Sequence, residues 1–246
     1  MDVNKPQICR VADANQFWLH YFSLEKALKD ISEYIAISKE NYQAYSFKNM
    51  QLYFAVCSEI DSIFKHIRRN ISEYSDECSD KRLTIVEHKA MIEKYFDGIK
   101  ETEVELNISG FNLQFQPFRT LFECHEKTKE RKAAAKEAGE EYDINNYEGW
   151  WNDYNSVKHR RLESFHKANL NNLLDSFSAL HILNLVYAIS LEAQWIENYD
   201  SVLIEAPATY HYPIFQIKNS GASRYTGGGH DYYRSNLSNK SIYPAY

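Results

Sequence analysis

The longest apolar segment of the chain, from about Glu163 to Ile196, constrains the fold more than any other feature. One face of this segment repeats apolar residues at i, i+3, i+4 and i+7, the spacing of a helix: Leu170, Leu173, Leu174, Phe177 and Leu180, continued by Asn184. Further apolar residues occupy the other faces: Ile182, Leu183, Val186 and Ile189. A helix that is apolar all round is buried among neighbours, so the sequence predicts a helical bundle with this segment as its spine.

Three other segments have the apolar periodicity of helices. The first runs from about Asn15 to Ile37 and the second from about Ser46 to Ile71. The third, "LTIVEHKAMIEKYF" at residues 83–96, is shorter. Glu59, on the second segment, flanks its apolar stripe and is expected to pack beside the spine.

Between these helices and the spine the periodicity changes. "VELNI" and "FNLQFQPF" alternate around Ser109-Gly110, which predicts a β-hairpin at about 104–118. The charged stretch at about 124–145 has no apolar face, so we expect a mobile insertion or an exposed helix outside the core. Residues 200–246 are rich in Gly, Ser, Asn and Tyr, and we expect an extended or partly disordered tail with room for a short strand at 201–215.

Composition and charge limit the classes of function and location. The formal net charge is −6, so any nucleic-acid contact is restricted to a local patch. The four cysteines are far apart and form no CxxC pair, which favours free thiols in a reducing compartment. The first residues lack the apolar core of a secretory signal, and "ALHILNLVYAISL" is too short to span a bilayer. We therefore expect a cytoplasmic protein that contacts no membrane.

The stretch "DYNSVKHRRLESFHKANL", residues 153–170, concentrates positive charge in this acidic chain. It holds two histidines, two arginines and two lysines. If residues 153–167 form one helix, Asn155, His159 and His166 fall within about 40° of one another and share a face. The long side chain of Arg161 reaches the same region, and Glu163 partly offsets the charge. The simple interpretation is a solvated helix end, and the alternative is a site that binds a phosphodiester.

These residue types suit RNA cleavage through the 2′-hydroxyl group. Histidine titrates near neutral pH and can serve as the base or the acid, and the arginine fork matches a phosphate. A metal site is less favoured, because His159 and His166 are seven residues apart and the chain has no HExxH or CxxC motif. We expect no metal and no cofactor.

The same stretch resembles HEPN domains, which are antiparallel helical bundles with an arginine, four to six residues and then a histidine near the start of a late helix. "RLESFH" gives Arg161, four residues and His166, and Arg160 matches with five intervening residues. Leu162 stands where the family often has a polar residue after the arginine. "YNSVKH" is a degenerate second match, with Asn155 and His159 in place but Tyr154 instead of the arginine.

The resemblance implies a mainly α fold: an antiparallel HEPN-like bundle over residues 1–199 with the hairpin and charged segment as insertions, followed by the tail. It also implies a metal-independent endoribonuclease, a toxin or a phage-defence (abortive-infection) effector, that acts as a homodimer with an antitoxin or defence-system partner. The alternative is a non-catalytic HEPN-like module that binds RNA, a nucleotide or a protein as a regulatory or structural dimer.

Specific roles follow for the residues of this region. The expected catalytic residues are Arg161, His166 and His159, the expected substrate contacts are Asn155, Lys158, Arg160 and Lys167, and Glu59 is a candidate to orient an imidazole. Each has a simpler interpretation, as a helix-end polar residue, a subunit contact or an exposed ion pair. Trp150 and Trp151 are more readily core or interface anchors than base-stacking residues.

Overall fold

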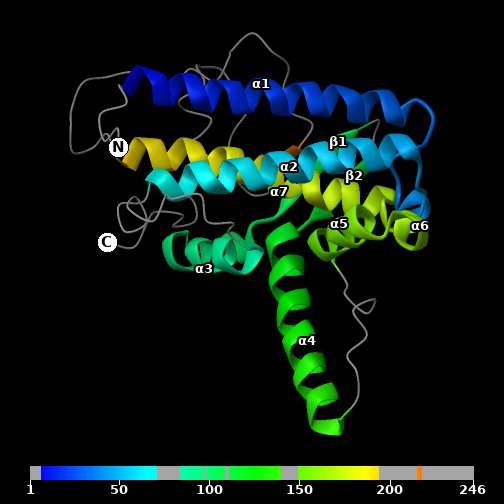
Figure 1. The fold of residues 1–246 in the computed structure, drawn as a ribbon. Coiled ribbons are helices and arrows are strands. Elements are labelled where there is room, and N and C mark those ends of the chain that lie inside the picture. The colour runs from blue at the N-terminus through cyan, green and yellow to red at the C-terminus, as the bar shows by residue number, and fades with distance from the viewer. Residues whose placement is uncertain are drawn as a thin grey trace.

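The chain folds as a mainly helical bundle with a small antiparallel sheet, in a computed structural model (Figure 1). The structure describes residues 7–70, 84–96, 98–108, 111–139, 149–193 and 215–217. No helix in these ranges is long and apolar enough to cross a membrane.

Seven α-helices, three short 3-10 helices and three strands are described. In chain order they are α1 (Gln7–Ser32), η1 (Lys39–Asn41), α2 (Phe47–Asn70), α3 (Ile85–Tyr95), η3 (Ile99–Glu101), β1 (Val104–Ile108), β2 (Phe111–Phe115), α4 (Pro117–Ala138), α5 (Trp150–His159), α6 (Arg161–Ser164), η5 (Phe165–Lys167), α7 (Leu170–Ala193) and β3 (Phe215–Ile217). The helices predicted at 46–71 and 83–96 are confirmed as α2 and α3, and the first helix begins and ends earlier than predicted.

The helix predicted as the spine is confirmed in α7, although it begins at Leu170 and not near Glu163. Every apolar side chain described on α7 is buried. Asn169 sets the start, because its side-chain oxygen accepts a hydrogen bond from the backbone N–H of Asn172 at 3.0 Å, as an N-cap does. Serines on this buried helix donate to carbonyls one turn back, as Ser178 does to Leu174 at 2.9 Å, so their hydroxyls are satisfied within the helix.

Three long helices form the main layer, and they are not all antiparallel. Phe17 near the start of α1 contacts His66 and Tyr187 near the ends of α2 and α7, so α1 runs opposite to both. Tyr45 and Asn169 pair where α2 and α7 begin, so these two helices run in the same direction (Figure 1). The prediction of an antiparallel bundle is therefore wrong for this pair. The long connection between α2 and α7 returns the chain to the end where α2 began.

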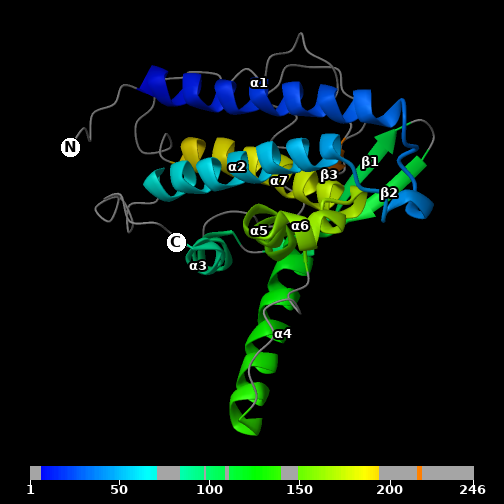
Figure 2. The ribbon, with the colours of Figure 1, turned by 45° about the vertical axis from the view of Figure 1, so that its right-hand side comes forward.

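The predicted hairpin is confirmed and is extended by a third strand. β1 pairs with β2 and, on its other side, with β3, both antiparallel (Figure 2). β3 lies in the segment predicted as a tail, and its Phe215 is fully buried and stacks on Phe177 of α7 at 5.6 Å. The sheet is thereby fixed to the spine. The rest of residues 194–246, with most of the predicted tail, and the Ser109-Gly110 turn lie outside the described residues.

The charged stretch after the hairpin forms the second half of a helix. α4 begins with Pro117 at its first turn and ends at Gly139, whose φ of 69° suits glycine. Its first half buries Phe118, Leu121 and Phe122, and the charged second half projects from the bundle (Figures 1 and 2). For residues 124–145, the prediction of an exposed helix is confirmed as far as Ala138, where α4 ends.

Candidate functional site

The basic stretch is not one helix. α5 ends at His159, and Arg160 leaves the helical conformation with φ −137° and ψ 53°. The chain then forms α6 and η5 before α7 begins. The prediction that His159 and His166 share a helix face is therefore wrong. Asn155 and His159 both belong to α5, four residues apart, and do share a face.

Arg161 and His166 lie on the short connection formed by α6 and η5. They are five residues apart, Arg161 at the start of α6 and His166 in η5. Both side chains are exposed, as is that of His159. Within the described part of the chain, no carboxylate lies at ion-pair distance from any of the three, and Arg161 does not pair with Glu163. The three side chains are therefore open to an external anion.

Of the other predicted substrate contacts, three are open to solvent and one is held in an internal ion pair. The Lys158 ammonium lies 5.4 Å from the centre of the Tyr154 ring and is exposed. Arg160 and Asn155 are half-exposed. Lys167 Nζ lies 2.8 Å from Asp153 Oδ1, with both side chains mostly buried, so Lys167 belongs to the internal structure of the site.

Asp153 joins three elements at this point. Besides the ionic contact with Lys167, its Oδ2 accepts a hydrogen bond from Asn172 Nδ2 at 2.9 Å. The same Asn172 amide donates to the Lys167 carbonyl at 2.9 Å. The connection of α6 and η5 is thus tied at its end to α5 and α7, which holds Arg161 and His166 in place. The sequence pattern gave no sign of this role for Asp153.

Glu59 does not reach the basic stretch. Its carboxylate lies 3.1 Å from Nδ1 of His20 on α1. Glu59 lies near the middle of α2, whereas the basic segment lies where α2 begins, after the chain has passed from α1 (Figure 1).

Exposed aromatic side chains border the basic segment. The Phe165 ring of η5 lies 5.3 Å from the Tyr45 ring and 4.7 Å from the Phe47 ring, between centres. Tyr45 is 51% exposed and Phe47 is 65% exposed, and Leu162 between Arg161 and Glu163 is 93% exposed. The sequence did not single out these aromatic residues, because Tyr45 and Phe47 lie more than 115 positions before Phe165 in the chain.

The two tryptophans of α5 are structural. Trp150 is fully buried, donates from Nε1 to the Pro117 carbonyl at 3.0 Å, and accepts at its own carbonyl from the Tyr53 hydroxyl. Trp151 packs edge-on against it at 5.6 Å and is also buried. The interpretation as core anchors is confirmed for both.

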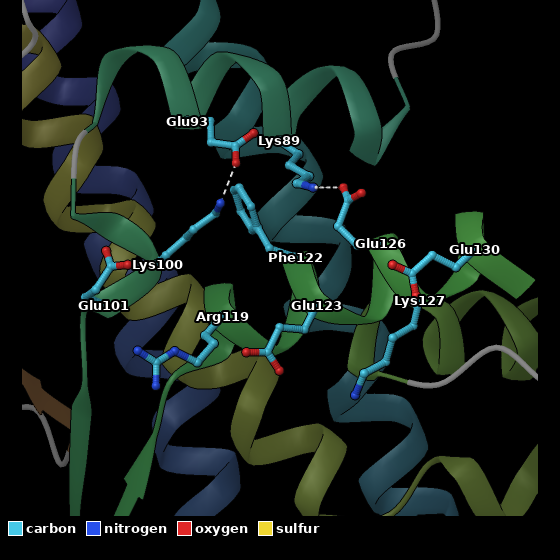
Figure 3. A pocket seen from close by; sticks show the side chains of 10 residues that line it. All are labelled: Lys89, Glu93, Lys100, Glu101, Arg119, Phe122, Glu123, Glu126, Lys127 and Glu130. Carbon is cyan, nitrogen blue, oxygen red and sulfur yellow. Dashed lines mark hydrogen bonds and ion pairs between the residues drawn. The ribbon is translucent and has the colours of Figure 1, made fainter.

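A second hollow lies between α3, η3 and α4 (Figure 3). Two of its lysines are paired with glutamates: Lys89 with Glu126 at 2.9 Å, and Lys100 with Glu93 at 2.6 Å. Both ammonium groups also lie about 4.5 Å from the centre of the Phe122 ring. The hydrogen bond from Lys89 lowers the pKa of Glu126 below its usual range. These pairs join α3 to α4 and to η3.

Two buried titratable groups, His181 and Asp175, lie on α7. Neither ring nitrogen of His181 has a hydrogen-bond partner among the described residues, and burial lowers its pKa to about 3. Burial raises the pKa of Asp175 to about 7. Within the same residues, no group of three or more His, Cys, Asp or Glu side chains is arranged to hold a metal ion.

No protein-family model, curated protein or solved structure matches this chain.

Proposed function

We propose that the chain is a HEPN-like, metal-independent endoribonuclease that cuts single-stranded RNA, with Arg161 and His166 as its catalytic residues. The observation that carries the proposal is the exposure of these two side chains and their lack of a carboxylate partner among the described residues. They are exposed on one short connection, and no described carboxylate neutralises them. A phosphodiester is the anion that an arginine and an imidazole together suit best.

The proposed reaction is transesterification within the RNA. An imidazole removes the proton of a 2′-hydroxyl group, whose oxygen attacks the adjacent phosphorus. The bond from phosphorus to the 5′-oxygen breaks, a second imidazole in its protonated form gives its proton to that oxygen, and a 2′,3′-cyclic phosphate remains. Arg161 stabilises the charge of the phosphorane. His166 supplies one imidazole, and His159 or His166 of a second copy supplies the other.

The resemblance of "RLESFH" to the HEPN motif supports this assignment, as does its position just before the longest buried helix. In a homodimer, two copies of the motif would act on the same RNA. A toxin or phage-defence effector, held inactive by a partner protein, is the role that we propose for such an enzyme.

Paired substitutions test the proposal. Arg161→Ala and His166→Ala are expected to abolish cleavage of single-stranded RNA and to leave the unfolding transition unchanged, because both side chains are exposed. Arg119→Ala, an exposed arginine on α4, and His20→Ala on α1 are matched controls and should cleave as wild type does. Products of the wild type should carry 2′,3′-cyclic phosphate ends. Cleavage that survives both site substitutions would remove the proposal.

A non-catalytic module that binds RNA, a nucleotide or a protein is the second candidate. Two observations favour it: Leu162 is apolar and 93% exposed where the family has a polar residue, and the buried Tyr154 stands where a second motif would have arginine. This candidate predicts binding that depends on Arg161 but no turnover of bound RNA.

A further inference from the structure

The aromatic residues beside Arg161 and His166 form a surface that the proposed reaction does not use. The six large apolar side chains that are highly exposed in the described ranges include Tyr45, Phe47 and Leu162. All three lie where α2 and α6 begin, at the same end of the bundle (Figure 1). An exposed apolar cluster at one place marks a binding surface more often than scattered residues do.

The Phe165 ring contacts the rings of both Phe47 and Tyr45. It is half-buried, and the Phe47 ring lies over it at 4.7 Å with an angle of 32° between the planes. Tyr45 meets the same ring edge-on at 83°. Phe47 is thus supported on one side by another ring, while 65% of its surface stays open to solvent.

The backbone fixes these rings before any ligand arrives. The segment that leads into α2 pairs with the start of α7, where Leu170 N–H donates to the Ala44 carbonyl at 2.9 Å and Asn171 N–H donates to the Tyr42 carbonyl at 3.0 Å. Ser46 then caps α2 by accepting from Asn49 N–H at 3.0 Å, which places Phe47 at the first helical position. A ligand that stacks on a fixed ring loses little free energy to ordering the protein.

The charge around the rings selects the kind of ligand. The exposed Lys48 follows Phe47, and Arg161 and His166 lie on the connection that carries Phe165. A phosphate chain that passes beside the rings would be neutralised by these cations, in one copy or where two copies share the RNA. Aromatic rings beside a cationic track are the elements that bind single-stranded nucleic acid.

We propose that Phe47 and Tyr45, supported by Phe165, form a base-stacking subsite that binds an unpaired base of RNA next to the phosphate contacted by Arg161. The subsite rests on the proposed function for its ligand. It adds to that function a requirement for an unstacked base beside the phosphate.

Binding of an uncleavable probe tests the subsite separately from catalysis. The probe is a short fluorescent 2′-O-methyl oligonucleotide of mixed sequence, which has no free 2′-hydroxyl, and an abasic version carries the same phosphates. Phe47→Ala should weaken binding of the probe by about ten-fold or more and leave binding of the abasic version unchanged. Phe47→Trp should retain binding. Arg161→Ala should weaken binding of both oligonucleotides.

Leu19→Ala is the matched control, since Leu19 on α1 is 51% exposed, as Tyr45 is. The subsite is overturned if wild type does not bind the probe, or if Phe47→Ala binds both oligonucleotides as wild type does. It is also overturned if Phe47→Ala only lowers the oligomeric state in sedimentation, which would assign the surface to a second copy. A wild type that binds the probe through Phe47 but never cuts RNA supports the subsite and removes the nuclease.

Discussion

Lys167 and Asp153 form an ion pair of 2.8 Å that joins the end of η5 to α5. The pair holds the end of the exposed connection that carries Arg161 and His166 against α5. Because Asp153 of α5 also accepts from Asn172 of α7, one carboxylate holds the end of η5 against both helices. The geometry of the candidate site therefore depends on a residue that does not face solvent.

Asp153→Ala is expected to lower the free energy of unfolding by about 2 kcal/mol, because it removes the carboxylate that contacts the mostly buried Lys167 ammonium and accepts from the Asn172 amide. Asp153→Asn should lose less, since its side-chain oxygen can still accept from Asn172. Urea unfolding measures both. The control is Asp30→Ala, an exposed acid on α1 that should change stability by less than about 0.5 kcal/mol. Equal losses in Asp153→Ala and Asp30→Ala would contradict the role of this pair.

His181 should make the fold sensitive to acid. Its pKa is about 3 in the folded chain and about 6.5 when unfolded, so between these values the unfolded state binds one more proton. Stability is then lost as pH falls, by about 1.4 kcal/mol per pH unit. Unfolding of wild type and His181→Phe, compared between pH 6 and pH 4, should show the wild type falling relative to the variant. Parallel curves would contradict a neutral, buried imidazole.

Asp175 should act in the opposite direction. Its pKa is about 7 in the folded chain and near 3.8 when unfolded, so the folded state binds the extra proton between these values. Stability is therefore lost as pH rises through this window. Asp175→Asn should become more stable than wild type as pH approaches 7 and should lose that relative gain below pH 4. A difference between the two proteins that does not vary with pH would show that Asp175 ionises normally.

Gly149 is needed where α5 begins against α4. Its φ of 95° is a conformation that other residues avoid, and an added Cβ would lie 2.8 Å from Cys124 Sγ. Gly149→Ala should destabilise the fold by about 2 kcal/mol or more, measured by thermal unfolding. Gly98→Ala is the control, because its φ of 78° costs about 1 kcal/mol but no atom lies near the added Cβ. If the two substitutions lower the stability by the same amount, the contact with Cys124 has no effect.

The sequence predicted the elements whose signals are local. The stripe of α2, the alternation of the hairpin and the apolar faces of α7 are patterns of neighbouring residues, and all three elements are present. The start of α7 was predicted too early, near Glu163, although Asn169 stands before the apolar run and caps it. The break at Arg160 contradicts the hypothesis of one helix over residues 153–167, a stretch that contains no glycine or proline.

The parts of the site that depend on distant contacts could not be read from the pattern. Phe47 continues the apolar stripe of α2, which predicts burial, yet it is exposed because the helix begins there at the edge of the bundle. β3 is three residues long and is defined by its pairing with β1, about 110 positions earlier. The motif residues Arg161 and His166 were predicted from sequence alone, and their exposure is compatible with that role.

Incubation of wild type with a mixed pool of single-stranded RNA in the presence of EDTA is the most direct test of the nuclease. It is run beside His166→Ala at the same protein concentration. We predict that wild type cuts the RNA in the presence of EDTA and that His166→Ala does not. Cleavage that stops in EDTA, or that continues in His166→Ala, would contradict a metal-independent site at His166. No cleavage by wild type would favour the binding module.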